Sequence, residues 1–261
     1  MIKFFRHIRQ TIIMENSKST RYFKYAIGEI ILVVIGILIA LQINTWNQAR
    51  LERISEQNIL KDLKVEFEAN FIDLNRVLNQ HQLILKELRA LQVISKSKDY
   101  TNIHLDSLTN SLIKWFSFTD RPGASNNLIS AGNLDIIQNT ELRDLITQWT
   151  GNVNDVIDDE VFLADFTRET ILPFLSKHYP ITNLEESNIK LLESLDMKID
   201  REASLVFDKK MVNWQVLLEN EQLQSYVALK KMYEYHCVLE CRITMRACKK
   251  IISLIKSELH D

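Results

Sequence analysis

The longest apolar run in the chain lies near its N-terminus. Residues 30–49 carry no charged side chain, and residues 30–41 are only Ile, Leu, Val, Ala and Gly. Tyr25 and Trp46 bracket the run at a separation of 21 residues, which corresponds to about 31 Å of helix and to the hydrocarbon thickness of a bilayer. Aromatic rings at both edges suit the two membrane interfaces. The pattern predicts a transmembrane helix over residues 25–46.

The charges around this run predict its orientation. Six basic and two acidic residues precede residue 30, whereas residues 50–53 mix both signs. Because short basic segments stay in the cytoplasm, we expect a basic cytoplasmic head at 1–24 and place residues 47–261 beyond the membrane. An A-x-A-like cleavage site is missing near position 40, so we expect an uncleaved signal anchor. The head is either a basic amphipathic helix on the lipid surface or an irregular tail.

One face of the expected membrane helix carries Glu29, Gly36 and Ala40. Gly36 and Ala40 form a small-xxx-small pattern, which lets two helix backbones approach closely. The Glu29 carboxyl group either hydrogen-bonds across such a pair or extends to the interface beside Lys24, and we favour the second. These three residues form the candidate association face of the membrane helix.

Beyond the apolar run, hydrophobic residues recur at the spacing of bundle helices. Every seventh position from 60 to 88 is apolar or histidine, namely Leu60, Phe67, Leu74, His81 and Leu88. A long first helix is predicted over residues 47–95, and a long last helix from about residue 213 should pair with it. The shorter elements expected are a loop at 95–102, a helix at 105–116, a helix capped by Ser125 and stopped at Gly132-Asn133, a helix from Thr140, breaks at Pro173 and Pro180, and a helix at 184–195. The predicted fold class is all-α, an N-terminal transmembrane helix followed by an elongated helical bundle.

The amino-acid composition supports this fold class and argues against nucleotide-binding folds and nucleic-acid binding. The 261 residues include five glycines and three prolines, too few for the tight turns of a β-sandwich or the glycine loops of nucleotide-binding folds. The net charge is −2, and without the basic first 29 residues it is −6. Because nucleic-acid surfaces are basic, we expect no nucleic-acid partner.

Three cysteines and two histidines are the candidate metal-ligating side chains. The cysteines share one helical face but lack a C-x-x-C spacing and an evident fourth ligand; they are Cys237, Cys241 and Cys248. Burial in the core is favoured over a metal site. His81 and His236 occupy core-like positions of the two long helices, where they either face each other as a pH sensor or are hydrogen-bonded core residues. We favour the second, and we expect no metal and no cofactor.

Other sequence patterns also favour a structural role over metal binding or catalysis. The acidic run Asp155, Asp158, Asp159 and Glu160 lacks the glycine and the alternation of a calcium loop, so a solvated helix face is expected. The G-x-S-x-G and H-E-x-x-H signatures do not occur in the sequence. We therefore expect no catalytic activity.

The segment 126–133 is rich in small and polar side chains. The favoured interpretation is a tight helix crossing, because residues 130–132 are small. The alternative is a pocket for a small molecule or peptide. Its candidate contacts are Asn126, Asn127, Ser130 and Asn133.

Several stretches resemble a family of uncharacterised proteins from Bacteroidota, filed as a domain of unknown function. The stretches are residues 1–6, 14–16, 25–44 and 123–134, with Asn139, Leu142-Arg143 and Trp149. The resemblance implies a bacterial inner-membrane anchor with a periplasmic helical body, and it implies no activity or catalytic residues.

These observations predict a membrane-anchored helical protein that binds a partner protein or ligand. Its expected partners are the lipid bilayer and either further copies of itself, as a homo-oligomer, or another subunit of a membrane complex. The alternative is a sensory or regulatory subunit, in which ligand binding to the bundle shifts the membrane helix. A head of about 24 residues is too short for a signalling domain, which weakens that alternative. An enzyme is the least favoured class.

Overall fold

The computed structural model describes residues 18–101, 104–194 and 208–259. Within these ranges the chain is helical and contains no strand, which confirms the all-α fold class. The patterned part of the basic head lies outside the described residues. The chain divides into two compact units, Met1–Asn58 and Ile59–Asp261.

The first unit contains the apolar segment of the long helix α2 (Lys18–Ser97). This segment has a mean hydropathy of 2.6 and is long and apolar enough to cross a membrane. Its large hydrophobic side chains are exposed, from Tyr22 to Ile54. The predicted association face, Glu29, Gly36 and Ala40, is exposed as well. A surface this apolar is what a lipid-embedded helix presents.

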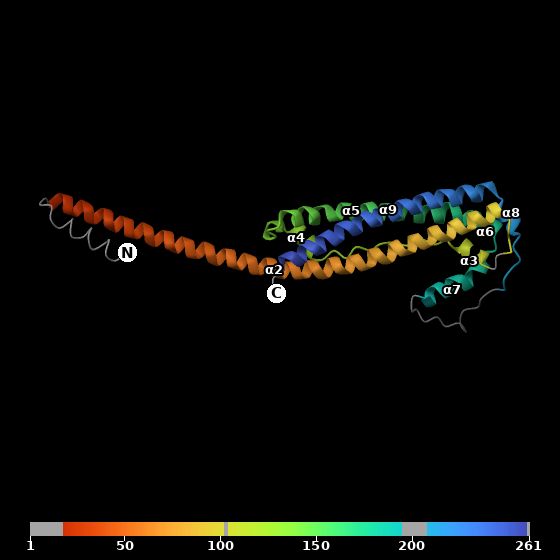
Figure 1. The fold of residues 1–261 in the computed structure, drawn as a ribbon, viewed down its shortest axis with the longest axis horizontal. Helices are drawn as coiled ribbons and strands as arrows, with labels where there is room; N and C mark the ends of the chain where they lie inside the picture. Colours follow the sequence, from red (N-terminus) through yellow and green to blue (C-terminus); the bar gives the residue numbers. More distant parts are fainter. Residues whose placement is uncertain (1–17, 102–103, 195–207, 260–261) are drawn as a thin grey trace. The chain divides into compact units, whose positions relative to one another are not determined.

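The second unit is a three-helix bundle (Figure 1). Its long helices are residues 59–97 of α2, α5 (Thr140–Phe166) and α9 (Glu221–Glu258). Glu68 of α2 pairs with Lys256 of α9, whereas Arg89, further along α2, bonds to Tyr235. The first and last long helices therefore pair, as predicted, and the structure shows that they run antiparallel. All five residues of the seven-residue repeat are fully buried.

Short elements join and cover these helices. They are α3 (Leu105–Asn110), α4 (Ala124–Ser130), the 3₁₀ turn η1 (Leu134–Ile136), the π turn η2 (Thr167–Ile171), α6 (Leu172–His178), the 3₁₀ turn η3 (Ile181–Leu184), α7 (Glu185–Ser194) and α8 (Trp214–Leu218). Helix α5 starts at the predicted Thr140. Its N-cap is Asn139, whose side chain accepts from the Leu142 N–H at 3.0 Å.

The helix predicted over 105–116 is wrong in its second half. It ends at Asn110, and residues 114–122 contain no helix. The polar residues at the end of α3 compete with the helix for backbone groups, since the Ser111 hydroxyl donates to the Leu108 carbonyl. We call residues 114–123 the strap.

One predicted helix cap is wrong, and one predicted helix is interrupted. Ser125 does not cap α4, because Gly123 holds the N-cap position and the Ser125 hydroxyl donates to Glu66 instead. The last long element starts near residue 213 as predicted, with Asn213 as the N-cap of α8. It is interrupted before α9, where Asn220 caps a new start by accepting from the Leu223 N–H at 3.0 Å.

The predicted stop after α4 is confirmed. Gly132 has φ +68°, in the left-handed region that glycine adopts without strain. The Asn133 N–H then reaches back to the Leu128 carbonyl at 3.0 Å. This bond closes the end of the helix as in a Schellman motif.

Candidate functional site

Four charged side chains lie inside the bundle and form what we call the buried charge cluster. They are His81 of α2, Glu160 of α5, and Lys230 and Glu234 of α9, each at most 2% exposed. The described core has two apolar regions, one around Phe67 and Trp149 and one around Leu88 and Phe174. Burying a charged group costs free energy unless the group is paired, so the contacts of these four residues determine whether the cluster is stable.

His81 lies between the two glutamates. Its Nδ1 is 2.7 Å from Glu234 Oε2, and its Nε2 is 3.4 Å from Glu160 Oε1. Burial lowers the pKa of His81, but the hydrogen bonds and negative charges of Glu160 and Glu234 outweigh burial and raise this pKa to about 9. The imidazole is therefore protonated at neutral pH and donates to both carboxylates.

Lys230 is the second buried cation of the cluster. Its Nζ donates to the Lys114 carbonyl at 2.8 Å and to Thr167 Oγ1 at 3.0 Å, and it lies 3.9 Å from Glu234 Oε1. Burial lowers the pKa of Lys230 to about 8. Within the described chain, Glu234 Oε1 has no hydrogen-bond partner. Two cations thus balance two anions, and the site is neutral as a whole.

Side chains of the long helices hold the strap. Glu160 Oε2 accepts from the Phe118 N–H at 2.7 Å, which connects the strap to the buried charge cluster. Three α2 residues also accept from backbone N–H groups here: Glu66 from Gly123 and Ser125, Asn70 from Arg121, and Asp73 from Thr119. Because the strap is not helical, these side chains satisfy backbone donors that would otherwise be unpaired.

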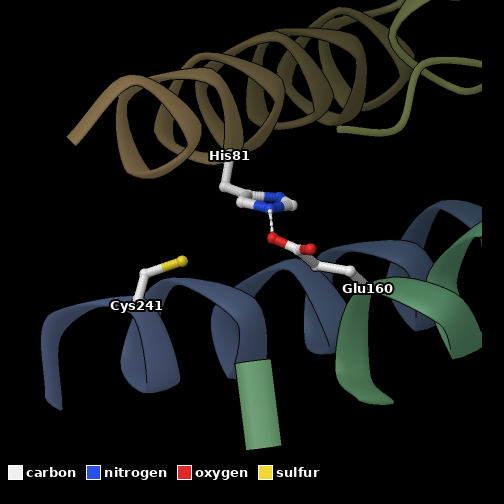
Figure 2. Close-up of side chains that lie close together, drawn as sticks. All are labelled: His81, Glu160 and Cys241. Atoms are coloured by element: carbon white, nitrogen blue, oxygen red, sulfur yellow. Dashed lines mark hydrogen bonds and ion pairs between the residues drawn. The ribbon is translucent and has the colours of Figure 1, made fainter. Parts of the chain in front are cut away.

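The three cysteines are buried and free, and all of them lie within the described residues. Burial raises the pKa of Cys241 and of Cys248 to about 12, so both are thiols at neutral pH. The Cys248 thiol lies 3.2 Å from the Phe67 carbonyl, to which it donates. The predicted burial of the cysteine stripe is confirmed. Cys241 lies close to His81 and Glu160 (Figure 2).

The structure corrects two predictions about ionisable residues. His236 is exposed, so it does not face His81, whose partner on α9 is Glu234. Glu160 is buried, although Asp155 and Asp158 of the same acidic run are exposed. Sequence reasoning also missed Glu234 altogether. The available signal was its spacing, since Lys230, Glu234, Cys237 and Cys241 recur every three or four residues along one face.

The predicted site around residues 126–133 is exposed. The candidate contacts Asn126, Asn127, Ser130 and Asn133 all face solvent. A tight helix crossing there is wrong, because a Cβ atom placed on Gly132 would have nothing within 4 Å. Asn126 alone of the four borders a surface cavity of about 400 Å³, which Asp120 and Trp149 also line. The ligand-contact interpretation stays a prediction.

A second apolar face of α9 points away from the core. Its members recur every three or four residues and are 38–49% exposed; they are Leu229, Met232, Tyr235, Leu239 and Ile243. We call them the outer stripe. A helix of a solvated bundle normally has one apolar face, so the outer stripe is a candidate interaction surface.

Comparison with known proteins gives one family match. Residues 29–152 match the model of a family of unknown function (DUF6090). The match confirms, over just under half of the chain, the resemblance to a family without assigned activity. It includes the apolar segment of α2, His81 and the strap, but not Glu160 or the residues of α9. No curated protein and no solved structure matches the chain.

Proposed function

We propose that the chain is a non-enzymatic, membrane-anchored interaction protein whose helical unit docks a second copy of itself. The outer stripe of α9 is the observation that carries this proposal. Its apolar side chains lie opposite the buried face of the same helix, where a solvated helix would present polar residues. A stripe that is apolar along its length can pair with an identical stripe about a two-fold axis.

We further propose that residues 25–46 cross the bacterial inner membrane once, with the N-terminus in the cytoplasm and the helical unit in the periplasm. The exposed apolar surface of α2 supports the crossing. The basic residues that precede it support the orientation, because positively charged flanks are retained on the cytoplasmic side. In this arrangement the bilayer is one partner and the second copy is the other.

The oligomeric state of the full-length protein in detergent tests the docking proposal. We expect the wild-type chain to be dimeric by light scattering, and the Leu239→Glu variant to dissociate at concentrations where wild type does not. A charge in the middle of an apolar interface is buried without a partner, which is costly. Val65→Glu is the matched control, since Val65 is 70% exposed on α2 and lies outside the outer stripe.

A contribution of the membrane helix is measured separately. Gly36→Leu fills the small-residue face of that helix and leaves α9 unchanged. Dissociation by Gly36→Leu but not by Leu239→Glu would place the contact in the membrane and contradict docking through the outer stripe. A monomeric wild-type protein would contradict self-association altogether.

A further inference from the structure

Three helices of the bundle bring one nitrogen, one oxygen and one sulfur ligand together. His81 comes from α2, Glu160 from α5 and Cys241 from α9, and Figure 2 shows their side chains converging on a common space. The three ligand atoms lie within 4.8 Å of one another, and all three residues are buried. Imidazole, carboxylate and thiolate are the protein ligands of zinc.

The distances suit a small ion. In a tetrahedral site with bonds of about 2.0–2.1 Å to nitrogen and oxygen, neighbouring ligand atoms are roughly 3.3 Å apart. His81 Nε2 and Glu160 Oε1 are already 3.4 Å apart. The Cys241 Sγ atom lies within 4.8 Å of both, and a rotation of its side chain brings it closer to them.

Neighbouring groups already orient two of the ligands. Glu234 Oε2 accepts from His81 Nδ1, which directs the other ring nitrogen toward Glu160. The backbone N–H of Phe118 donates to Glu160 Oε2 and leaves Oε1 toward the histidine. A carboxylate behind a metal-bound histidine is the usual second layer of metal sites. The neighbouring groups therefore fix the orientation of His81 and Glu160, in addition to the proximity of the three residues.

We propose that His81 Nε2, Glu160 Oε1 and Cys241 Sγ bind a divalent transition-metal ion of the zinc class. The imidazole and the thiolate select against calcium and magnesium, which take oxygen ligands. A water molecule takes the fourth position, as in other zinc sites with three protein ligands.

Charge balance favours this exchange. When the ion binds, His81 loses its Nε2 proton and Cys241 loses its thiol proton, and both protons leave to solvent. Two positive charges enter as two protons depart, so the net charge of the buried site does not change. The ion therefore takes the place of the protonated histidine without an unbalanced charge in the core.

The inference does not depend on the proposed docking function, and cobalt(II) tests it by a spectroscopic signature. Full-length protein in detergent, first treated with a chelator, is titrated with Co²⁺ alone. We expect one equivalent to produce an ultraviolet thiolate-to-cobalt charge-transfer band and intense visible bands typical of tetrahedral coordination. One equivalent of Zn²⁺ should then remove these bands and raise the Tm, since a ligand that binds only the folded state stabilises it.

Matched cysteine variants locate the ligand. Cys241→Ser should abolish the charge-transfer band, whereas Cys248→Ser should retain it, because Cys248 is equally buried on the same helix but bonds to the Phe67 carbonyl. Absence of the band in the wild-type protein would overturn the proposal, whether or not the variants fold. A band that persists in Cys241→Ser and vanishes in Cys248→Ser would overturn it too. Visible bands without charge transfer would show binding to surface histidines or carboxylates only, and would also overturn it.

Discussion

At the scale of residues, the distinctive feature of this protein is charge in the core. His81, Glu160, Lys230 and Glu234 are buried where a three-helix bundle would ordinarily place leucine or valine. Taking an ion out of water costs several kcal/mol, and here the opposite charges and the backbone carbonyl of Lys114 offset that cost. Replacing one of these four residues should therefore be strongly destabilising, because it leaves a buried charge without its partner. The loss should exceed the net stabilisation that the intact ion pair contributes.

The Lys230→Met variant tests this expectation. Methionine fills a similar volume but leaves His81 as the only cation beside the Glu234 carboxylate within the described residues, and it leaves the Lys114 carbonyl without this donor. We expect a loss of about 3–5 kcal/mol in the free energy of unfolding. Lys250 lies on α9, as Lys230 does, and makes an exposed ion pair with Glu141 of α5, so Lys250→Met should cost at most about 1 kcal/mol. Chemical denaturation measures both, and equal losses would contradict a special cost at the buried lysine.

The difference in the free energy of unfolding between wild type and Lys230→Met should depend on pH, and the direction of that dependence follows from the pKa of Lys230. Because burial lowers the pKa of Lys230 from 10.5 to about 8, the unfolded chain binds more protons at this lysine between these two values. The contribution of Lys230 to the free energy of unfolding therefore rises as pH increases through that interval. In the folded protein Glu234 faces this lysine, and His81 lies on the other oxygen of the same carboxylate. Unfolding curves for wild type and Lys230→Met should diverge further with increasing pH, and convergence would contradict the assignment.

At the scale of elements, the strap has no hydrogen-bonding ladder of its own. The heptad pattern of α2 predicted which residues face the core, but not that Glu66, Asn70 and Asp73 accept from the backbone of residues 119–125. These three residues lie at intervals of four and three along α2, so one helix face follows the strap. The polar side chains replace the backbone partners that a helix would have supplied.

Glu66→Ala should therefore loosen the strap and the start of α4. The carboxylate accepts from the N–H groups of both Gly123 and Ser125 at 3.1 Å. Each donor left unpaired costs on the order of 1–3 kcal/mol. Hydrogen exchange should accelerate at Ser125, and the free energy of unfolding should fall. Glu68→Ala is the control, because that carboxylate makes a half-exposed ion pair with Lys256; protection at Ser125 that is unchanged by Glu66→Ala would contradict this account.

At the scale of the whole molecule, the two units differ in where their hydrophobic side chains lie. The described part of α2 before Asn58 exposes its hydrophobic side chains, whereas the unit from Ile59 onward buries two apolar clusters. The first segment is long and apolar enough to cross a membrane, which is the arrangement proposed above. The topology of the full chain is therefore the property to measure.

A fusion of alkaline phosphatase to the C-terminus measures this topology. The enzyme needs disulfide bonds that form only outside the cytoplasm, so we expect the fusion to be active. Ile35→Arg should reduce its activity, because arginine at the centre of a membrane helix costs about 2.5–3.5 kcal/mol of insertion. Ile54→Arg, which lies outside the apolar run, should not reduce it. An inactive wild-type fusion would contradict the proposed orientation.

The sequence by itself determined the elements whose signal is local and repeated. Hydropathy over some twenty residues identified the apolar segment of α2, and heptad spacing identified its buried residues, because both depend on neighbours along one helix. It also determined the stop at Gly132, since the left-handed conformation at φ +68° favours glycine.

Only the tertiary structure decided the chemistry. Cys241 was recognised as a core residue from the sequence. Its position beside His81 and Glu160 depends on how three helices pack, because these residues are 79 or more positions apart in the sequence. Glu160 was taken for a solvated residue because it belongs to an acidic run without a calcium-loop pattern, and only packing against the other helices makes it buried. Periodicity shows which face of a helix is inward. It does not show which inward side chains meet, because that depends on the register between helices.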